Sequence, residues 1–238
     1  NAKYDVLIFV DGGIPARDAG GRGSGAGGDT GEFAGNQPAP ESIPAEFRDR
    51  LGRVSVARTV PELMKFVEAG GTLLTIGSST SMGYHAKLPI KDALVERVAG
   101  GAERALPNEK FYIPGTLLEA RIDNSNPLAW GMDQTAMIFF DHSPAFRLDP
   151  AAASRSVKPV AWFDNATPLR SGWAWGQQYL DQAVEVVDAP IGKGRLVLFG
   201  PEITWRAQPH GTFKFLFNGI YVNATSASGS MRTTDQQR

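Results

Sequence analysis

The sequence predicts a single flavodoxin-like α/β domain, in which a mainly parallel sheet carries helices on both faces and a β-rich insertion. Three observations indicate this class. Continuous apolar runs of strand length lie at residues 4–10, 72–76 and 195–199, as in strands buried on both faces. An amphipathic helical pattern separates the first two runs, which is typical of a right-handed β-α-β unit. Residues 115–189 hold further strand-like segments broken by proline and glycine.

The composition is that of an ordinary globular domain, since 42% of the 238 residues are hydrophobic and 21% are charged. A formal net charge of −1 provides no field that would attract nucleic acid or an anionic membrane, so we expect neither as a partner. Cysteine is absent, which excludes disulfides, thiolate metal sites and a cysteine nucleophile. The sequence has no apolar run long enough for a membrane span, and we expect none.

Both ends of the chain are expected to lie outside the domain, which we place at residues 3–224. Residues 1–2 resemble the remnant of a removed tag. A strand follows almost at once, with no signal peptide before it, so we interpret the chain as an excised domain whose targeting signal lies elsewhere. From residue 225 the side chains are small and polar, which predicts a disordered tail over residues 225–238.

The first strand is followed by a segment over residues 12–42 that we expect to be a mobile loop. Ten of the 24 residues from 12 to 35 are glycine, and few large apolar side chains are present to offset the entropy of ordering. A G-x-G-x-x-G spacing within this segment lacks the preceding strand and following helix of a dinucleotide site. We therefore interpret that spacing as accidental.

Two helices are expected before the second buried strand. Residues 43–51 predict a short helix, and a longer one begins at Thr59, a residue type that caps helices, and ends before Gly70. A short strand is expected at residues 54–57 and a third helix near residues 91–98. The remaining expected elements are strands at residues 115–122, 136–140, 157–163 and 183–189, and a closing helix at residues 212–221.

Polar side chains follow each of the three buried strands. Asp11 comes after the first strand, Ser78 and Ser79 after the second, and Glu202 after the third. Open α/β sheets bind ligands at the carboxyl ends of their strands, so this edge is the candidate site.

The serines and the glutamate at this edge each have two possible roles. A serine at a strand-to-helix turn acts as a nucleophile when a base activates it, whereas the alternative is that these hydroxyls cap the next helix. Glu202 either orients such a base or holds its own loop through hydrogen bonds.

Three histidines, His85, His142 and His210, are available as a base or as metal ligands. None belongs to a spaced ligand motif such as H-x-x-E or H-E-x-x-H, so we predict no metal site in this chain. His85 lies one helical turn beyond the serines, and His210 follows Glu202 in the next loop; these two are the candidate bases. The alternative is that all three form hydrogen bonds within loops.

Trp173 and Trp175 alternate in the sequence, so an extended backbone places both rings on one face. Exposed rings of this kind stack on sugars or form a partner interface. The alternative is that they are buried in the core or against a neighbouring domain. We treat both as candidate carbohydrate-binding residues.

The segment VLFGPE, which contains the last buried strand and its turn, resembles the VQFHPE signature of class I glutamine amidotransferases. In that family the histidine and glutamate complete a Cys-His-Glu triad. Here Gly200 stands at the histidine position, only Glu202 remains, and Ser78 or Ser79 lies nearest to where the cysteine is expected. The resemblance therefore implies an amidotransferase-like fold with a degenerate site.

Residues 3–222 also resemble the C-terminal domain of bacterial zinc-carboxypeptidase-like proteins. The segments that carry this resemblance include YDVLIFVDGGIP, KFYIPGTLLEARIDNSNPLAWGM and GRLVLFGPEITWRAQPHG. In that family the peptidase chemistry belongs to a separate N-terminal domain with an H-x-x-E zinc site. The resemblance implies a periplasmic or secreted protein, the peptidase domain as partner, zinc in that domain only, and no cofactor in this segment.

We predict from these observations a non-catalytic accessory domain, which binds a partner or presents a substrate, in an exported zinc-carboxypeptidase-like protein. Two alternatives remain open. One is a serine-dependent hydrolase that uses Ser78 or Ser79 with His85 or His210. The other is a carbohydrate- or cell-wall-binding module that uses Trp173 and Trp175.

Overall fold

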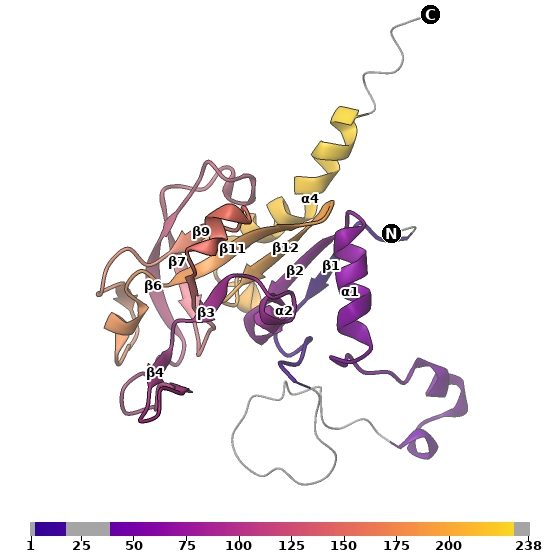
Figure 1. Ribbon diagram of the computed structural model, residues 1–238, viewed down its shortest axis with the longest axis horizontal. Coiled ribbons are helices and arrows are strands. Elements are labelled where there is room, and N and C mark those ends of the chain that lie inside the picture. The colour runs from indigo at the N-terminus through magenta and orange to yellow at the C-terminus, as the bar shows by residue number, and fades with distance from the viewer. Residues whose placement is uncertain (1–2, 18–38, 231–238) are drawn as a thin grey trace, which may run out of the picture.

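The computed structural model describes residues 3–17 and 39–230, which form a mixed α/β fold around one large sheet (Figure 1). The sheet follows the path β1-β2-β12-β11-β9-β6-β10, with β7, β8 and β3 attached beside it. Its strands are β1 (Val6–Phe9), β2 (Thr72–Ile76), β3 (Ile90–Asp92), β6 (Thr116–Ile122), β7 (Thr135–Phe140), β8 (Phe146–Leu148), β9 (Lys158–Trp162), β10 (Leu169–Ser171), β11 (Val184–Ile191) and β12 (Gly194–Phe199). A separate hairpin consists of β4 (Val95–Arg97) and β5 (Glu103–Ala105).

Helices and short helical turns connect these strands. The α-helices of the described ranges are α1 (Thr59–Glu68), α2 (Met82–His85), α3 (Ala151–Ser154) and α4 (Phe213–Ser230). The 3-10 turns are η1 (Pro40–Ser42), η2 (Ala45–Arg50), η3 (Gly77–Ser81), η4 (Pro127–Ala129), η5 (Gln177–Leu180), η6 (Trp205–Ala207) and η7 (His210–Thr212). None of these helices is long and apolar enough to cross a bilayer.

The three apolar runs identified in the sequence form the parallel part of the sheet. β1 pairs with β2 and β2 pairs with β12, both in parallel, and α1 provides the crossover between the first two strands. β11 and β12 are joined by a tight turn and are antiparallel, as are the remaining pairs of the sheet. The predicted α/β class is confirmed, and the β-rich insertion extends this parallel core with antiparallel strands.

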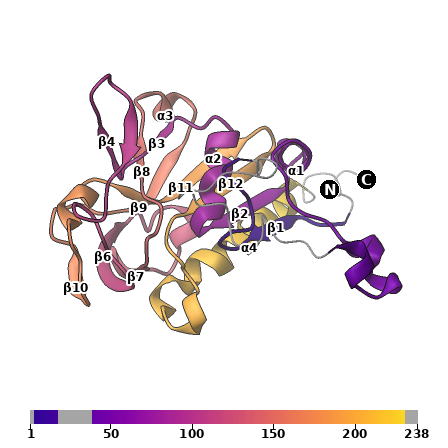
Figure 2. The same cartoon turned by 90° about the horizontal axis from the view of Figure 1, so that it is seen from below.

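Helices cover both faces of the parallel core. Successive residues of a strand point to opposite faces, and Leu73 and Leu74 of β2 accordingly belong to different apolar clusters. Leu73 shares its cluster with Leu63 of α1, whereas Leu74 shares its cluster with Phe215 of α4. Figure 2 shows α1 and α2 on one side of β2 and α4 on the other. β2 and most of β12 are therefore buried on both faces, which explains their apolar runs. The same expectation for the first run is wrong, because β1 is an edge strand in which Ile8 is 43% exposed.

Several local expectations are corrected. Residues 91–98 contribute to β3 and β4 rather than to a helix, because pairing with β8 and β5 overrides their local propensity. Residues 54–57 form no strand, since they lead directly into α1, where the carbonyl of Ser55 accepts the N–H of Thr59. Residues 43–51 contain only the short 3-10 helix η2.

The C-terminal helix is longer than expected. α4 continues to Ser230, whereas the sequence pattern predicted its end at residue 221 and a disordered tail from residue 225. Residues 225–230 are therefore helical, which corrects that prediction, because alanine and serine in this stretch are compatible with helix once the first turns are packed. Residues 231–238 lie outside the described ranges.

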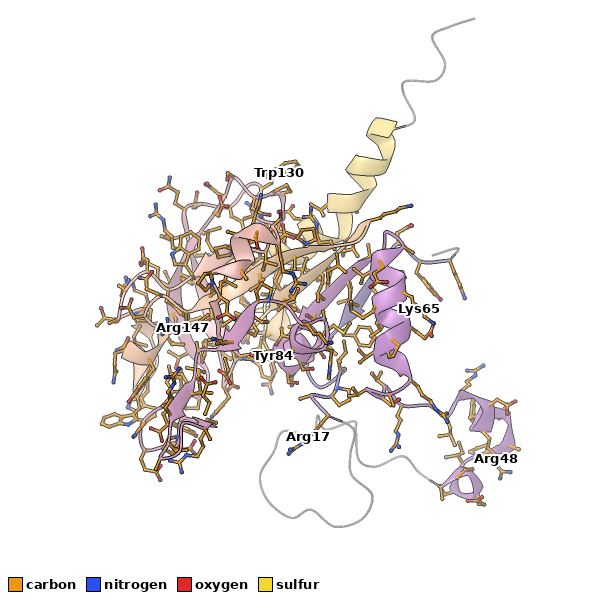
Figure 3. The ribbon with its side chains drawn as sticks, in the orientation of Figure 1. Arg17, Arg48, Lys65, Tyr84, Trp130 and Arg147 are labelled. Carbon is orange, nitrogen blue, oxygen red and sulfur yellow. The ribbon has the colours of Figure 1, made fainter. Side chains whose placement is uncertain are left out.

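Large apolar side chains that stay exposed include Tyr84 and Trp130, both labelled in Figure 3.

Candidate functional site

A cavity of about 360 Å³ opens at the carboxyl ends of β1, β2 and β12. Three residues predicted from the sequence line it together: Asp11 after β1, Ser78 after β2 and Glu202 after β12. The loop at residues 141–144, which follows β7, and Trp205 of η6 form the rest of the wall. The parallel topology explains the first three, because the carboxyl ends of parallel strands meet at one edge of the sheet.

The Ser78 hydroxyl is engaged by a carboxylate. Ser78 Oγ donates to Asp11 Oδ1 at 2.7 Å and accepts the N–H of Gly12 at 2.8 Å. The Ser78 N–H also donates to Asp11 Oδ1, at 2.7 Å. These bonds join the turn after β2 to the turn after β1, and they leave the hydroxyl proton directed at Asp11 rather than at an imidazole.

Ser79 and His85 hold the chain that follows β1 and do not line the cavity. Ser79 Oγ, fully buried, donates to the carbonyl of Val10 and accepts the N–H of Ile14 at 3.0 Å. His85 Nε2 lies 2.9 Å from the carbonyl oxygen of Pro15. The start of the segment predicted as a mobile loop, residues 12–17, is therefore pinned by side chains from η3 and α2. Residues 18–38 of that segment lie outside the described ranges.

Two glycines at the edge of the cavity leave no space for a side chain. Gly77 directly follows β2 and has φ +61°, and a Cβ atom built there would lie less than 3.0 Å from Asp11 Oδ1. A Cβ atom built on Gly200 would lie less than 3.0 Å from the carbonyl oxygen of Pro144. The histidine of the amidotransferase signature therefore does not fit at position 200 with this backbone.

Sequence reasoning missed an imidazole that the fold places in the cavity. His142 Nδ1 lies 2.7 Å from Asp141 Oδ1. An ionised carboxylate only accepts hydrogen bonds, so the Nδ1–H of His142 donates to Asp141. The backbone of His142 has φ 49°, a left-handed conformation that is uncommon outside glycine. One feature of the sequence could have identified His142: the pair Asp141-His142 directly follows the strand predicted at residues 136–140. A search for spaced metal ligands does not detect such a pair.

The cavity is acidic. Asp11, Asp141 and Glu202 line it together with His142, and among the described residues no lysine or arginine does so. Burial raises the pKa of the Glu202 carboxyl above its ordinary value, and the nearby charges of Asp11 and Asp141 raise it further. Within the described ranges, no group of three histidine, aspartate or glutamate side chains has the arrangement of a metal site.

Trp205 closes one wall of the cavity in a stack of three groups. Its ring lies 5.7 Å from that of Phe139 at an interplanar angle of 11°, and the guanidinium of Arg206 lies 4.8 Å from its centroid. Arg206 and Ala207 have left-handed backbone angles, with φ 45° and 56°. Arg206 thus contacts Trp205 and forms no ion pair with Glu202 among the described residues.

The remaining predicted residues lie outside the cavity lining. His210 Nε2 lies 2.9 Å from the carbonyl oxygen of Ala207, and its ring packs on Phe213, so it shapes the start of α4. Trp173 and Trp175 are 55% and 53% exposed, respectively, rather than buried in the core.

The two tryptophans differ in their contacts. Trp175 Nε1 donates to the carbonyl of Glu109 at 2.7 Å, and its backbone bridges to Tyr112. The ring of Trp173 lies 5.8 Å from that of Tyr112, which in turn lies 5.1 Å from His142. Trp173 is therefore linked to the cavity rim through one intervening ring.

Comparison with known proteins yields likenesses of fold only. No protein-family model matches the chain, and no curated protein matches it. Similar solved structures include a GMP synthase-like protein from Thermoplasma acidophilum, with 10% identity, TM-score 0.44, and coverage of 73% of this chain and 68% of that one. A ThuA-like protein from Parabacteroides merdae has 11% identity and TM-score 0.43, over 74% of this chain and 67% of that one.

A β-galactosidase from Bacillus circulans is similar at 11% identity and TM-score 0.40, over 72% of this chain. The present chain spans only 21% of the length of that enzyme. At these identities and TM-scores none of the likenesses bears on activity. The α/β class of the chain therefore rests on its own sheet and helices, and no family is assigned from these likenesses.

Proposed function

We propose that this chain is a non-catalytic binding domain that holds an amine-bearing ligand in the acidic cavity at the carboxyl edge of its parallel strands. The observation that carries the proposal is the composition of the cavity wall, which three carboxylates line without a lysine or arginine from the described part of the chain. A ligand ammonium group placed among Asp11, Asp141 and Glu202 would receive charge-assisted hydrogen bonds.

The geometry supports binding rather than hydrolysis. A serine nucleophile requires a base within hydrogen-bonding reach, but Ser78 Oγ donates to Asp11 and accepts from Gly12. The imidazole of the cavity, His142, is bonded to Asp141, and no hydrogen bond joins it to Ser78 within the described ranges. The hydroxyl, imidazole and carboxylate groups thus form two separate pairs instead of one triad.

The amine proposal predicts that Nα-acetyl-lysine amide binds and that Nα-acetyl-norleucine amide, which lacks only the ammonium group, does not. We expect Glu202→Gln to weaken binding of the lysine compound about tenfold or more, the size of one charge-assisted hydrogen bond. Because the pKa of Glu202 is raised, its carboxyl loses the proton at a higher pH than an ordinary glutamate does. The affinity of the wild type for the lysine compound should therefore rise with pH as Glu202 ionises, and Glu202→Gln should lack this rise. Isothermal titration calorimetry at several pH values measures both effects.

Glu62→Gln on α1 is the matched control, since Glu62 is an exposed carboxylate that pairs with Lys65 away from the cavity. We expect this variant to bind like the wild type. Equal binding of the lysine and norleucine compounds would contradict the proposal. Hydrolysis of glutamine or an ester that Ser78→Ala abolishes would replace it with the serine-hydrolase alternative.

A second candidate function, carbohydrate binding, is favoured by the ring contacts that lead from His142 through Tyr112 to exposed Trp173. Sugars that start in the cavity and cross this row would stack on Trp173. We expect Trp173→Ala to weaken binding of an N-acetylglucosamine tetramer by about 0.5–1.5 kcal/mol. Trp130→Ala, which removes another exposed tryptophan, is the control. Tetramer binding that is equal in both variants, or absent from the wild type, would exclude this function.

The resemblance of residues 3–222 to zinc-carboxypeptidase-like proteins supports a further part of the proposal. The domain would then accompany an N-terminal peptidase domain in a periplasmic or secreted protein, with zinc bound by that peptidase domain. The full-length reading frame tests this directly, because an upstream H-x-x-E motif with a later histidine is required.

A further inference from the structure

A second cavity, of about 440 Å³, lies where β6 and β9 separate. In these strands Arg121 pairs with Trp162 and Ile122 with Ala161, and directly beyond them the Asp123 N–H donates to the Val160 carbonyl at 2.9 Å. Beyond them Pro159 of β9 has no N–H with which to continue a ladder. The cavity opens in this gap and shares no lining residue with the acidic cavity.

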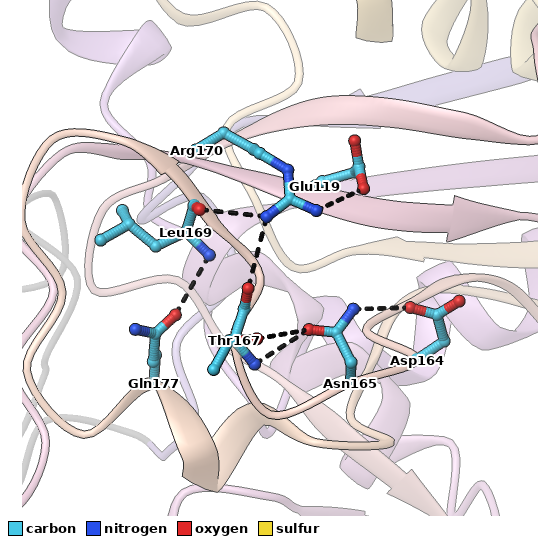
Figure 4. Close-up of polar contacts among 7 residues, drawn as sticks. All are labelled: Glu119, Asp164, Asn165, Thr167, Leu169, Arg170 and Gln177. Atoms are coloured by element: carbon cyan, nitrogen blue, oxygen red, sulfur yellow. Dashed lines mark hydrogen bonds and ion pairs between the residues drawn. The ribbon is translucent and has the colours of Figure 1, made fainter.

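The wall of this cavity carries two cations, Arg121 and Lys158, that form no ion pair in the part of the chain that the structure describes. Arg121 is half-buried, and neither it nor Lys158 forms an ion pair or a side-chain hydrogen bond among the described residues. The neighbouring position on the same face of β6 differs, because Glu119 pairs with Arg170 at 2.7 Å (Figure 4). A guanidinium that is partly removed from water usually has a paired anion. The unpaired Arg121 therefore points to an anion supplied from outside.

The other lining groups narrow the class of that anion. The Trp162 indole N–H has no acceptor among the described residues and remains available as a donor. Asp123 is the carboxylate of the wall, and its Oδ1 accepts from the N–H and hydroxyl of Ser125 at 3.1 and 2.6 Å. Two cations and one carboxylate leave a net charge of +1. That charge matches a single carboxylate better than a phosphate monoester, which carries about −1.5 to −2 at neutral pH.

We infer that this cavity binds an acidic sugar, a ring that carries one carboxylate. Arg121 would hold the carboxylate through two parallel N–H bonds, with Lys158 as a second donor. The ring of Trp162 would contact the sugar ring, as aromatic side chains do with apolar faces. Gln134 and Asn124 supply amide groups at the same wall for hydroxyls of the sugar.

Titration of the 238-residue chain with glucuronate, glucose and glucose 6-phosphate tests this inference. We expect glucuronate to bind, glucose to bind at least tenfold more weakly, and Arg121→Gln to weaken glucuronate binding about ten- to a hundredfold. Lys158→Gln is a second variant on an exposed side chain, and we expect it to weaken binding severalfold. Arg147→Gln removes a cation that bonds backbone carbonyls elsewhere, and it should bind glucuronate like the wild type.

The outcomes are distinguishable from those of the acidic cavity, because Glu202→Gln should leave glucuronate binding unchanged. Thermal unfolding establishes that each variant is folded before its affinity is compared. Glucuronate binding that is unaffected by both Arg121→Gln and Lys158→Gln would overturn the site. Glucose 6-phosphate binding as tightly as glucuronate would overturn the assignment to a carboxylate, and the absence of any glucuronate binding would overturn the inference as a whole.

Discussion

Replacing Gly200 with alanine is expected to lower the free energy of unfolding by about 3 kcal/mol. The added Cβ atom would lie less than 3.0 Å from the carbonyl oxygen of Pro144, which is backbone and has no rotamer through which to move away. Gly200 is also held to β11, because its N–H donates to the carbonyl of Glu185 at 2.8 Å. Relief of the clash therefore requires displacement of β12 or of the loop at residues 141–144. Urea denaturation followed by circular dichroism measures the loss.

Gly211 provides the matched control, since it is exposed and a Cβ atom built there would have no other atom within 4 Å. We expect Gly211→Ala to change stability by less than about 0.5 kcal/mol. If Gly200→Ala were as mild as Gly211→Ala, the close approach of Pro144 would not be a constraint. A histidine at position 200 would then be structurally possible, and loss of the amidotransferase triad would be a matter of sequence alone.

The buried framework was predictable from the sequence because burial on both faces leaves a direct mark. A strand covered by helices on both faces has few polar side chains, so β2 and most of β12 form nearly continuous apolar runs. The positions of Asp11, Ser78 and Glu202 at one edge then follow from the parallel pairing. The short strands β3 and β4 were not predictable in this way. β3 pairs with β8, which is distant in the sequence, and β4 pairs with β5, whose residues show no clear strand pattern.

The candidate site was predictable only in part for a related physical reason. His142 reaches the cavity from the β-rich insertion, and antiparallel pairing of that insertion with the parallel core leaves no local signature. The backbone constraint at Gly200 is equally invisible, because the atom that excludes a side chain belongs to Pro144, far away in the sequence. The sequence shows that position 200 is not histidine, but only the tertiary structure shows that the Pro144 carbonyl leaves no space for a side chain there.

Replacing Glu185 with leucine is expected to stabilise the domain by about 1–4 kcal/mol at pH 8. Glu185 is fully buried in β11, and neither carboxylate oxygen has a hydrogen-bond partner among the described residues. It occupies an irregularity in the ladder, since Val184 pairs with Trp162 and Val186 pairs with Ala161. Burial raises the pKa of this carboxyl well above its ordinary value, because the charged form has no compensating partner.

The pH dependence of this effect has a definite sign. A raised pKa means that the folded state binds more protons than the unfolded state between the two pKa values, so stability falls as pH rises through that interval. The slope reaches about 1.4 kcal/mol per pH unit for a single group, beginning near the unfolded glutamate pKa of about 4.3. Leucine removes this slope, so the stability gap between Glu185→Leu and the wild type should be smallest near pH 4 and should widen toward pH 8.

Asp188, three residues further along β11, provides the control. Leucine at this position is expected to destabilise the domain, so the comparison shows whether any stabilisation by Glu185→Leu comes from removal of a buried charge or from added apolar volume. Asp188 Oδ2 accepts from Asn126 at 3.2 Å and from Arg195 at 3.4 Å. Asp188→Leu would leave both donors without their acceptor and should destabilise the domain at neutral pH. Urea denaturation at pH 4.5 and 8 compares the two variants. A wild type that is at least as stable as Glu185→Leu at pH 8 would mean that the Glu185 carboxylate has partners, such as ordered water, that stabilise its charge.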